Sequence, residues 1–339
     1  MSGTKPADTN PGSPAPTSIG RRLYGTFRLI LILGLIFLAL SPVLSQPTAR
    51  PRLLRVGYLA RETSGHPSGG ALEGMRDALW KNDVVRAELE REGFTGIGLF
   101  ACDGYSDMAR RLNQREFHVA FTPATLYARQ TVGYTAVLKS RRKEDSFSPN
   151  GRVWRQGVIF VSSRSPLHGT KEITAESLAD YLSRERLAVA GTQSVAGFEA
   201  PLLRLAEDYN IRGAEGGYLW FESSEEVAKG VLSGVADIGA CEEQALDRLL
   251  EQEGLKDKRD QLIRVILRSD RIPTDPVVLL PSLEPRASAL GRELRRAIRE
   301  FSLRGGLGEL QYATATDLDY GAVTQLLDEF SRRVGEVPF

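Results

Sequence analysis

Residues 187–206 read LAVAGTQSVAGFEAPLLRLA and combine a hydroxyl-rich turn with the start of a predicted helix. The apolar run at 187–190 is typical of a buried strand, and the apolar residues after Gly197 recur at helical spacing. Amides and hydroxyls at the first turn of a helix converge at the positive end of its dipole, which suits a bound anion. The groups concerned are the hydroxyls of Thr192 and Ser194 and the amides of Val195, Ala196 and Gly197. This pattern predicts a binding site for an anionic group.

A second helix start follows the apolar residues 117–121, where Thr122 precedes Pro123. Threonine is a favoured N-cap, and proline is favoured at the first helical position. We therefore expect a helix that begins here, with Thr125 in its first turn. Such caps occur in helices of every kind, so Thr122 and Thr125 either contact a ligand or only stabilise the helix. Tyr58 ends the first predicted strand, and it either lines the binding site or belongs to the core.

No pattern for catalysis, a metal ion or a cofactor occurs in the sequence. His66, His118 and His168 are far apart and lack the spacing of metal ligands. There is no G-x-S-x-G motif, no Walker A motif and no paired-cysteine motif. A disulfide between Cys102 and Cys241 is allowed in an exported protein, but two separate buried residues are the expected arrangement. With 44 basic and 43 acidic residues, no net field would attract nucleic acid. These observations predict a binding protein without a cofactor, rather than an enzyme.

Predicted strands and helices alternate along the chain after residue 53, which favours an α/β fold of mostly parallel sheets flanked by helices. Charged, turn-rich segments at 140–156 and 268–276 interrupt the alternation and indicate two crossings between two lobes. The expected boundaries are 54–154 plus 274–339 for lobe 1 and 155–273 for lobe 2. Ligands in such sheets sit at the carboxyl ends of the strands, which predicts a site in the cleft between the lobes.

The N-terminal residues have a different composition from the rest of the chain. Residues 1–28 are rich in Pro, Ser and Thr and end in a basic flank, which predicts a disordered tail. Residues 29–45 are mostly apolar, as in a signal peptide, and slightly short for a spanning helix. Both cleavage and retention as a membrane anchor fit this segment. Either outcome places the residues after the linker 46–53 in the periplasm or another extracytoplasmic compartment.

Four segments together resemble a known family. They are SVAGF before a predicted helix, FESSEEVAKGVLSGVADIGA, SDRIPTDPVVLLPSL and the late D-x-D-Y at 317–320. With this spacing, residues 54–335 resemble the phosphate/phosphonate-type solute-binding proteins of ABC importers. The resemblance implies the two-lobed type II periplasmic-binding-protein fold. It also implies a small anionic or zwitterionic ligand in the interlobe cleft and an ABC permease in the membrane as partner.

The resemblance implies roles for two further residues. Arg155 stands where a ligand-contacting tyrosine is common, and its planar guanidinium suits a carboxylate or a phosphonate. Asp275, in the segment IPTDP, matches an aspartate that receives a ligand amine. The chain departs from the family pattern where SVAG replaces the usual STSG, and at Glu225, where histidine is frequent. These departures concern the identity of the ligand rather than the fold.

Two other functions remain open from the sequence. The same fold could serve as a ligand sensor or scaffold that stays tethered to the membrane through residues 29–45. An enzyme related to thiamin-pyrimidine biosynthesis is the third alternative, and the export signal argues against it. A mature N-terminus near Gln46 would favour the free importer subunit.

Overall fold

The computed structural model describes residues 52–60, 66–130, 132–142, 153–191 and 194–335. All of them belong to one compact unit, Arg52–Phe339, which is distinct from Met1–Pro51. The predicted tail 1–28, the apolar segment 29–45 and most of the linker therefore lie outside the described residues. Within the described ranges, no helix has both the length and the apolar character that crossing a membrane requires.

Six strands form the first sheet, in the order β11-β4-β10-β3-β1-β2. Their bounds are β1 Leu53–Leu59, β2 Gly96–Cys102, β3 Val119–Phe121, β4 Thr135–Arg142, β10 Pro276–Leu279 and β11 Leu310–Thr314. Side chains alternate between the two faces of the sheet, as the pleat requires. In β3, for example, Val119 and Phe121 join one hydrophobic cluster and Ala120 joins the other.

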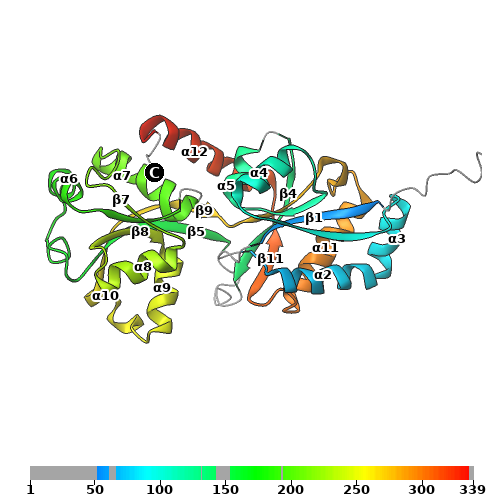
Figure 1. Ribbon diagram of the computed structural model, residues 1–339, viewed down its shortest axis with the longest axis horizontal. Helices are drawn as coiled ribbons and strands as arrows, with labels where there is room; N and C mark the ends of the chain where they lie inside the picture. The colour runs from blue at the N-terminus through cyan, green and yellow to red at the C-terminus, as the bar shows by residue number, and fades with distance from the viewer. Residues whose placement is uncertain (1–51, 61–65, 131, 143–152, 192–193, 336–339) are drawn as a thin grey trace, which may run out of the picture. The chain divides into compact units, whose positions relative to one another are not determined.

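Helices cover both faces of this sheet (Figure 1). The first hydrophobic cluster is covered by α2 (Gly69–Lys81), α3 (Asp83–Arg91) and α11 (Ala289–Leu303), and the second by α4 (Tyr105–Asn113), α5 (Ala124–Arg129) and α12 (Gly321–Arg333). Each helix buries one apolar stripe, which in α2 consists of Leu72, Met75 and Leu79. Ser68 begins α2 by accepting a hydrogen bond from the amide of Ala71.

Five strands form the second sheet, in the order β7-β6-β8-β5-β9. Their bounds are β5 Trp154–Ser162, β6 Leu187–Ala190, β7 Tyr218–Phe221, β8 Ile238–Glu242 and β9 Ile263–Pro273. The helices that accompany them are α6 (Ala175–Arg184), the π-helical turn η2 (Val195–Glu199), α7 (Ala200–Tyr209), α8 (Ser224–Ser233), α9 (Glu243–Gln252) and α10 (Arg259–Leu262). One face packs against α6 and α7, and the other packs against α8 and α9.

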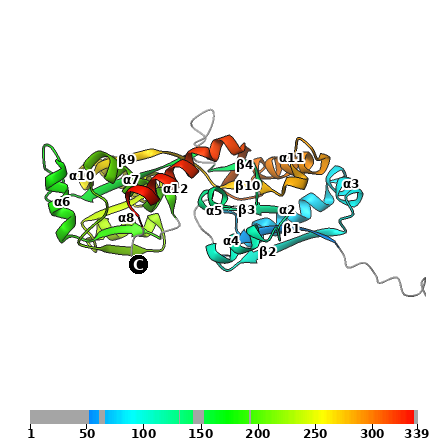
Figure 2. The ribbon, with the colours of Figure 1, turned by 90° about the horizontal axis from the view of Figure 1, so that it is seen from above.

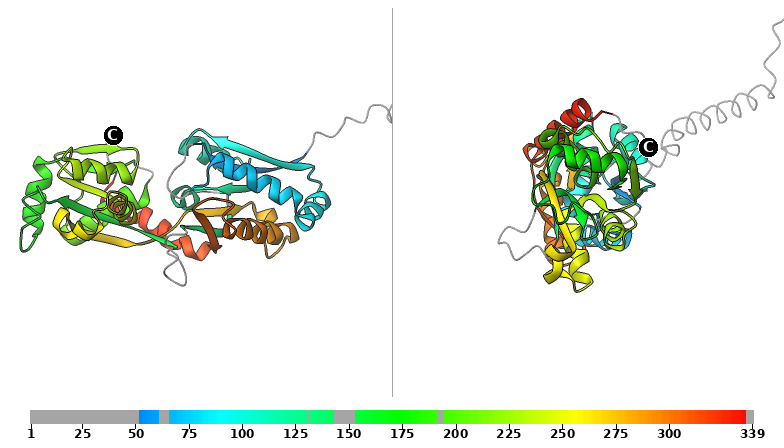
Figure 3. Two further views of the ribbon diagram at one scale, coloured as in Figure 1. Left: turned by 90° about the horizontal axis from the view of Figure 1, so that it is seen from below. Right: turned by 90° about the vertical axis from the view of Figure 1, so that its left-hand side faces the viewer.

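Two features connect the halves built on these sheets. Strand β9, paired with β5 in the second sheet, ends at Pro273, and the chain enters the first sheet at once with β10, which begins at Pro276 (Figure 3). The last helix, α12, places Val323 and Leu327 in a cluster of the first sheet and Phe330 in a cluster of the second (Figure 2). The lobe boundaries 54–154 plus 274–339 and 155–273 stay predictions.

The α/β prediction is confirmed, but the pairing within the sheets needs a correction. Both sheets are mixed rather than mostly parallel: β10 runs against β3 and β4, and β5 runs against β8 and β9. The polar segment 268–276, expected as an irregular crossing, is largely strand because β9 continues to Pro273. Strand direction depends on long-range pairing, which local apolar patterns do not encode.

Candidate functional site

A cavity of about 940 Å³ is lined by residues from both sheets. Six of the predicted ligand residues lie on its wall: Thr125, Arg155, Ser194, Val195, Ala196 and Asp275. Tyr58, Thr122 and Gly197 are not among the lining residues, and Thr192 lies outside the described residues. The cavity volume falls within the ordinary range of about 300–1,000 Å³ for small-molecule sites.

The turn after β6 starts a helix as predicted, but the start is a π-helical turn from Val195 rather than an α-helix from Gly197. The hydroxyl of Ser194 accepts a hydrogen bond from the amide of Gly197 at 3.0 Å, so Ser194 is the N-cap. The amides of Val195 and Ala196 donate to no other residue that the structure describes. These two amides at the wall of the cavity are therefore suited to an acceptor from a ligand.

Close packing holds this turn in place. A Cβ atom at Gly157 of β5 would come within 2.3 Å of the carbonyl oxygen of Ala196. A Cβ atom at Gly197 would come within 2.7 Å of the Ser194 hydroxyl and 2.8 Å of the Ala190 methyl group. Only glycine fits either position without moving the turn, so the geometry of the helix start depends on both residues.

The second predicted helix start differs from the prediction in its cap. The N-cap of α5 is Pro123, which offers no side-chain hydrogen bond, and the helix begins at Ala124. The missing cap comes from far along the chain, because Oδ1 of Asp275 accepts the amide hydrogen of Ala124 at 3.0 Å. Thr122 is fully buried, and its own amide donates to Pro276 of β10. The prediction that Thr122 caps this helix is therefore wrong, whereas Thr125 lies in the first turn as expected.

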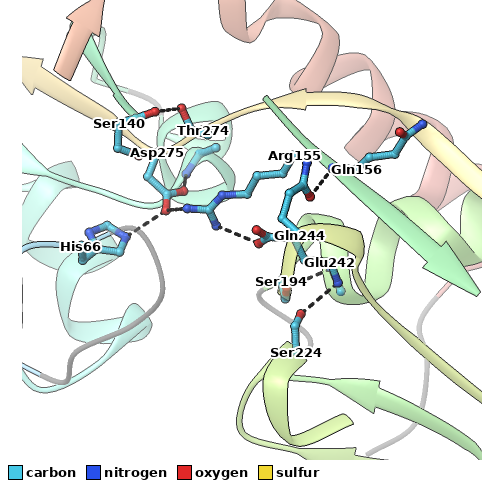
Figure 4. Close-up of polar contacts among 12 residues, drawn as sticks. His66, Ser140, Arg155, Gln156, Ser194, Ser224, Glu242, Gln244, Thr274 and Asp275 are labelled. Atoms are coloured by element: carbon cyan, nitrogen blue, oxygen red, sulfur yellow. Dashed lines mark hydrogen bonds and ion pairs between the residues drawn. The ribbon is translucent and has the colours of Figure 1, made fainter. Parts of the chain in front are cut away.

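Arg155 and Asp275 form an ion pair at the wall of the cavity (Figure 4). Nη2 of Arg155 donates to Oδ2 of Asp275 at 2.8 Å, and Nη1 lies 3.6 Å from Oε2 of Glu242. Burial works against the charge of Arg155, but Asp275 and Glu242 outweigh it and raise the pKa of the guanidinium. On the other side, Nε2 of His66 lies 3.4 Å from Oδ2 of Asp275. Burial lowers the pKa of His66 in spite of Asp275, so the imidazole is neutral at pH 7.

A second group of charges continues from Glu242 along the wall. Oε1 of Glu225 accepts a hydrogen bond from Arg248 at 2.7 Å, and Arg248 also lies 3.9 Å from Glu242. Burial opposes the ionisation of Glu225, but the contact with Arg248 lowers its pKa, so it carries a charge. Burial lowers the pKa of Arg142 at the end of β4, whose charge interacts with those of Arg248, Glu242 and Glu225. The buried part of the wall thus consists of interlocked ion pairs.

Several of these residues were not predicted as ligand residues from the sequence. His66, Glu225, Glu242 and Arg142 line the cavity although each is distant in sequence from its partners. The position of Glu242 at the end of strand β8 could have indicated a ligand residue from the sequence, whereas nothing in the local sequence of His66 does so. Tyr58 instead packs against the core of the first sheet, with its hydroxyl beside Gly69 at the start of α2.

Two absences concern only the part of the chain that the structure describes. No group of three or more His, Cys, Asp or Glu residues there has a geometry that could hold a metal ion. Cys102 and Cys241 are both buried and unpaired, as expected for separate residues. Burial raises the pKa of the Cys102 thiol to about 11, so it is protonated at pH 7.

Several solved structures share this fold. XAC2383 from Xanthomonas citri, bound to ATP, is similar with a TM-score of 0.58 and 16% identity, over 84% of this chain and 99% of that one. A binding protein component of an ABC phosphonate transporter from Pseudomonas aeruginosa is similar with a TM-score of 0.55 and 14% identity, over 84% of this chain and 88% of that one. PhnD1 from Prochlorococcus marinus, in complex with methylphosphonate, is similar with a TM-score of 0.54 and 15% identity, over 84% of this chain and 99% of that one. Together they confirm the type II periplasmic-binding-protein fold.

Sequence comparison identifies the family. No curated protein sequence matches the chain. The family model described as "ABC transporter, phosphonate, periplasmic substrate-binding protein" matches residues 81–320, which is more than two thirds of the chain and confirms the resemblance. The chain belongs to the family of periplasmic substrate-binding proteins of phosphonate ABC transporters.

Proposed function

We propose that this protein captures a small anionic or zwitterionic ligand of the phosphonate type in the 940 Å³ cavity and delivers it to an ABC permease. The observation that supports this most directly is the start of η2. There the amides of Val195 and Ala196, which have no acceptor among the described residues, lie on the cavity wall together with the cation of Arg155. Main-chain amides and a guanidinium are the usual partners of a phosphonate oxygen.

In this proposal the anion is held mainly by the half built on the second sheet. Asp275 already accepts the amide of Ala124, so the start of α5 offers less to an anion than the start of η2 does. Thr125 would contact the ligand from the first sheet, because it lies on the cavity wall in α5. A ligand that contacts both halves stabilises their closed arrangement, which is the form that a permease would read.

The family works outside the cytoplasmic membrane, and its proteins bind and deliver solutes rather than convert them. A tethered sensor remains the alternative function, because the apolar residues 29–45 would hold an uncleaved chain at the membrane. The mature N-terminus of the protein purified from whole native cells separates the two functions. A start near Gln46 favours the free importer subunit, and an intact Met1 favours the tethered sensor.

The variant Ser194→Asp tests the site itself. Aspartate caps a helix as well as serine does, so the thermal stability of the variant should stay close to that of the wild type. Its carboxylate would face the ligand anion, and two like charges about 4 Å apart cost about 4 kcal/mol at a partly solvated site. We expect the Kd for methylphosphonate, measured by isothermal titration calorimetry on the full-length chain, to rise by about three powers of ten.

The matched control is Ser194→Asn, which keeps a good cap without adding a charge. It should bind within about tenfold of the wild type. If Ser194→Asp binds methylphosphonate as tightly as Ser194→Asn does, the anion lies elsewhere and the proposed site is wrong.

A further inference from the structure

Asp275 is engaged by three groups of the chain itself. Its Oδ1 accepts the amide of Ala124 at 3.0 Å, and its Oδ2 accepts a hydrogen bond from Arg155 at 2.8 Å. Nε2 of His66 approaches the same Oδ2 at 3.4 Å (Figure 4). The residue as a whole is only 9% exposed. A ligand amine would have to share this carboxylate with partners that belong to the chain.

Arg155 also connects the two halves of the cavity wall. Its guanidinium lies between Asp275, which follows β9, and Glu242, at the end of β8, at 2.8 and 3.6 Å. Glu242 is held in turn, because its amide donates to the hydroxyl of Ser224 at 3.0 Å. Both buried carboxylates near the ligand site are thus paired with the same cation of the chain, and Glu242 also lies 3.9 Å from Arg248.

The other charges on the wall do not restore an attraction for an amine. Glu225 is paired with Arg248 at 2.7 Å. The remaining lining carboxylates Asp103, Glu222, Glu226 and Glu309 are all exposed to solvent, where water and salt screen their charges. Arg155 lies on the same cavity wall as the amides of η2, and it is the cation paired with both Asp275 and Glu242.

We propose that Arg155 determines the specificity of this cavity: it takes the place of a ligand amine at Asp275 and Glu242, so the protein selects anions without an amine. This inference rests on the proposed function and narrows it. Arg155 would contact the anion, whereas Asp275 would act as a positioning residue that holds the guanidinium. An amine in the same place would meet a like charge, and it would have to compete with that cation for Asp275 and Glu242.

The test compares two ligands that differ only in the amine, ethylphosphonate and 2-aminoethylphosphonate, by calorimetry on the full-length chain. The wild type should bind ethylphosphonate at least about 100-fold more tightly. Arg155→Met removes the cation and keeps an apolar stem, which leaves Asp275 and Glu242 without it. This variant should bind 2-aminoethylphosphonate more tightly than ethylphosphonate, by at least about tenfold.

Further variants separate specificity from a structural effect. Arg155→Lys keeps the charge and should keep the wild-type order of the two ligands. The double variant Arg155→Met/Asp275→Asn should lose the reversed preference, because the amine would have lost its carboxylate. Arg304→Met, at an 81% exposed arginine at the end of α11, is the matched control and should behave as the wild type.

Two results would overturn the inference while leaving the proposed function intact: equal or tighter binding of the amine ligand by the wild type, or an unchanged ligand order in Arg155→Met. If the wild type binds neither phosphonate, the proposed function fails, and this inference fails with it. The wild-type ratio requires no variant, so the test stands even if Arg155→Met does not fold.

Discussion

We expect Glu199→Gln to remove a pH-dependent loss of stability. Glu199 ends η2, its side chain is 3% exposed, and Arg129 of α5 lies 2.5 Å from its Oε1. Its Oε2 is buried and has no hydrogen-bond partner among the described residues. Burial outweighs the attraction of Arg129 and raises the pKa of Glu199 from 4.5 to about 7.

A raised carboxyl pKa lowers stability once the pH exceeds the value of the unfolded chain. Between pH 4.5 and about 7, the unfolded chain loses the Glu199 proton while the folded chain keeps it. The free energy of unfolding therefore falls as the pH rises through this window and is constant above it. Each pH unit corresponds to about 1.4 kcal/mol, so the loss over the window amounts to about 3 kcal/mol. Glutamine cannot ionise and avoids this loss.

The assay is differential scanning calorimetry of the full-length chain at about pH 4.5 and about pH 8. We compare the Tm of Glu199→Gln minus that of the wild type at the two pH values. At roughly 2 °C per kcal/mol, this difference should be larger at about pH 8 than at about pH 4.5 by up to about 6 °C. The control Glu207→Gln lies on α7, where an exposed Glu207 faces Arg204, and should leave the pH dependence unchanged. A Tm difference for Glu199→Gln that is the same at both pH values would refute the reasoning.

Two further predictions concern packing and acid stability. Gly157→Ala should lower both the Tm and the affinity for methylphosphonate, because its Cβ would come within 2.3 Å of the Ala196 carbonyl oxygen and displace η2. Scanning calorimetry measures the Tm, and titration calorimetry measures the affinity. Unchanged affinity would show that η2 does not bind the anion. Burial, aided by Arg52 and Arg55, lowers the pKa of His118 from 6.5 to about 4, so the unfolded chain binds a proton first and stability falls as the pH drops through this range. His118→Asn should reduce that fall in urea denaturation curves, and an equal fall in both proteins would contradict the assignment.

The parts of the fold that could be predicted from the sequence are those set by local pattern. The apolar run at 187–190 and the capped turn after it predicted β6 and the start of η2, because Ser194 and Gly197 are neighbours in sequence. The resemblance to solute-binding proteins predicted the two-sheet architecture. It could not fix the direction of each strand, since β10 pairs with β3 across about 150 residues.

The interior of the site depended on contacts that no local pattern contains. Asp275 caps α5 from 151 positions away, and this contact replaced the cap expected from Thr122. Arg155 and Asp275 are 120 positions apart, so the resemblance implied a ligand contact for each but not the ion pair between them. His66 was regarded as a dispersed histidine, and only the folded chain brings it to the same carboxylate.

The strand order has a consequence for the sequence of events in folding. All five strands of the second sheet lie between residues 154 and 273, so that sheet can assemble from one continuous stretch of chain. In the first sheet, β10 stands between β3 and β4, so β4 cannot join β1, β2 and β3 until residues 276–279 have arrived. Completion of the first sheet would therefore wait for a late segment, and during export this half would depend longest on protection from aggregation.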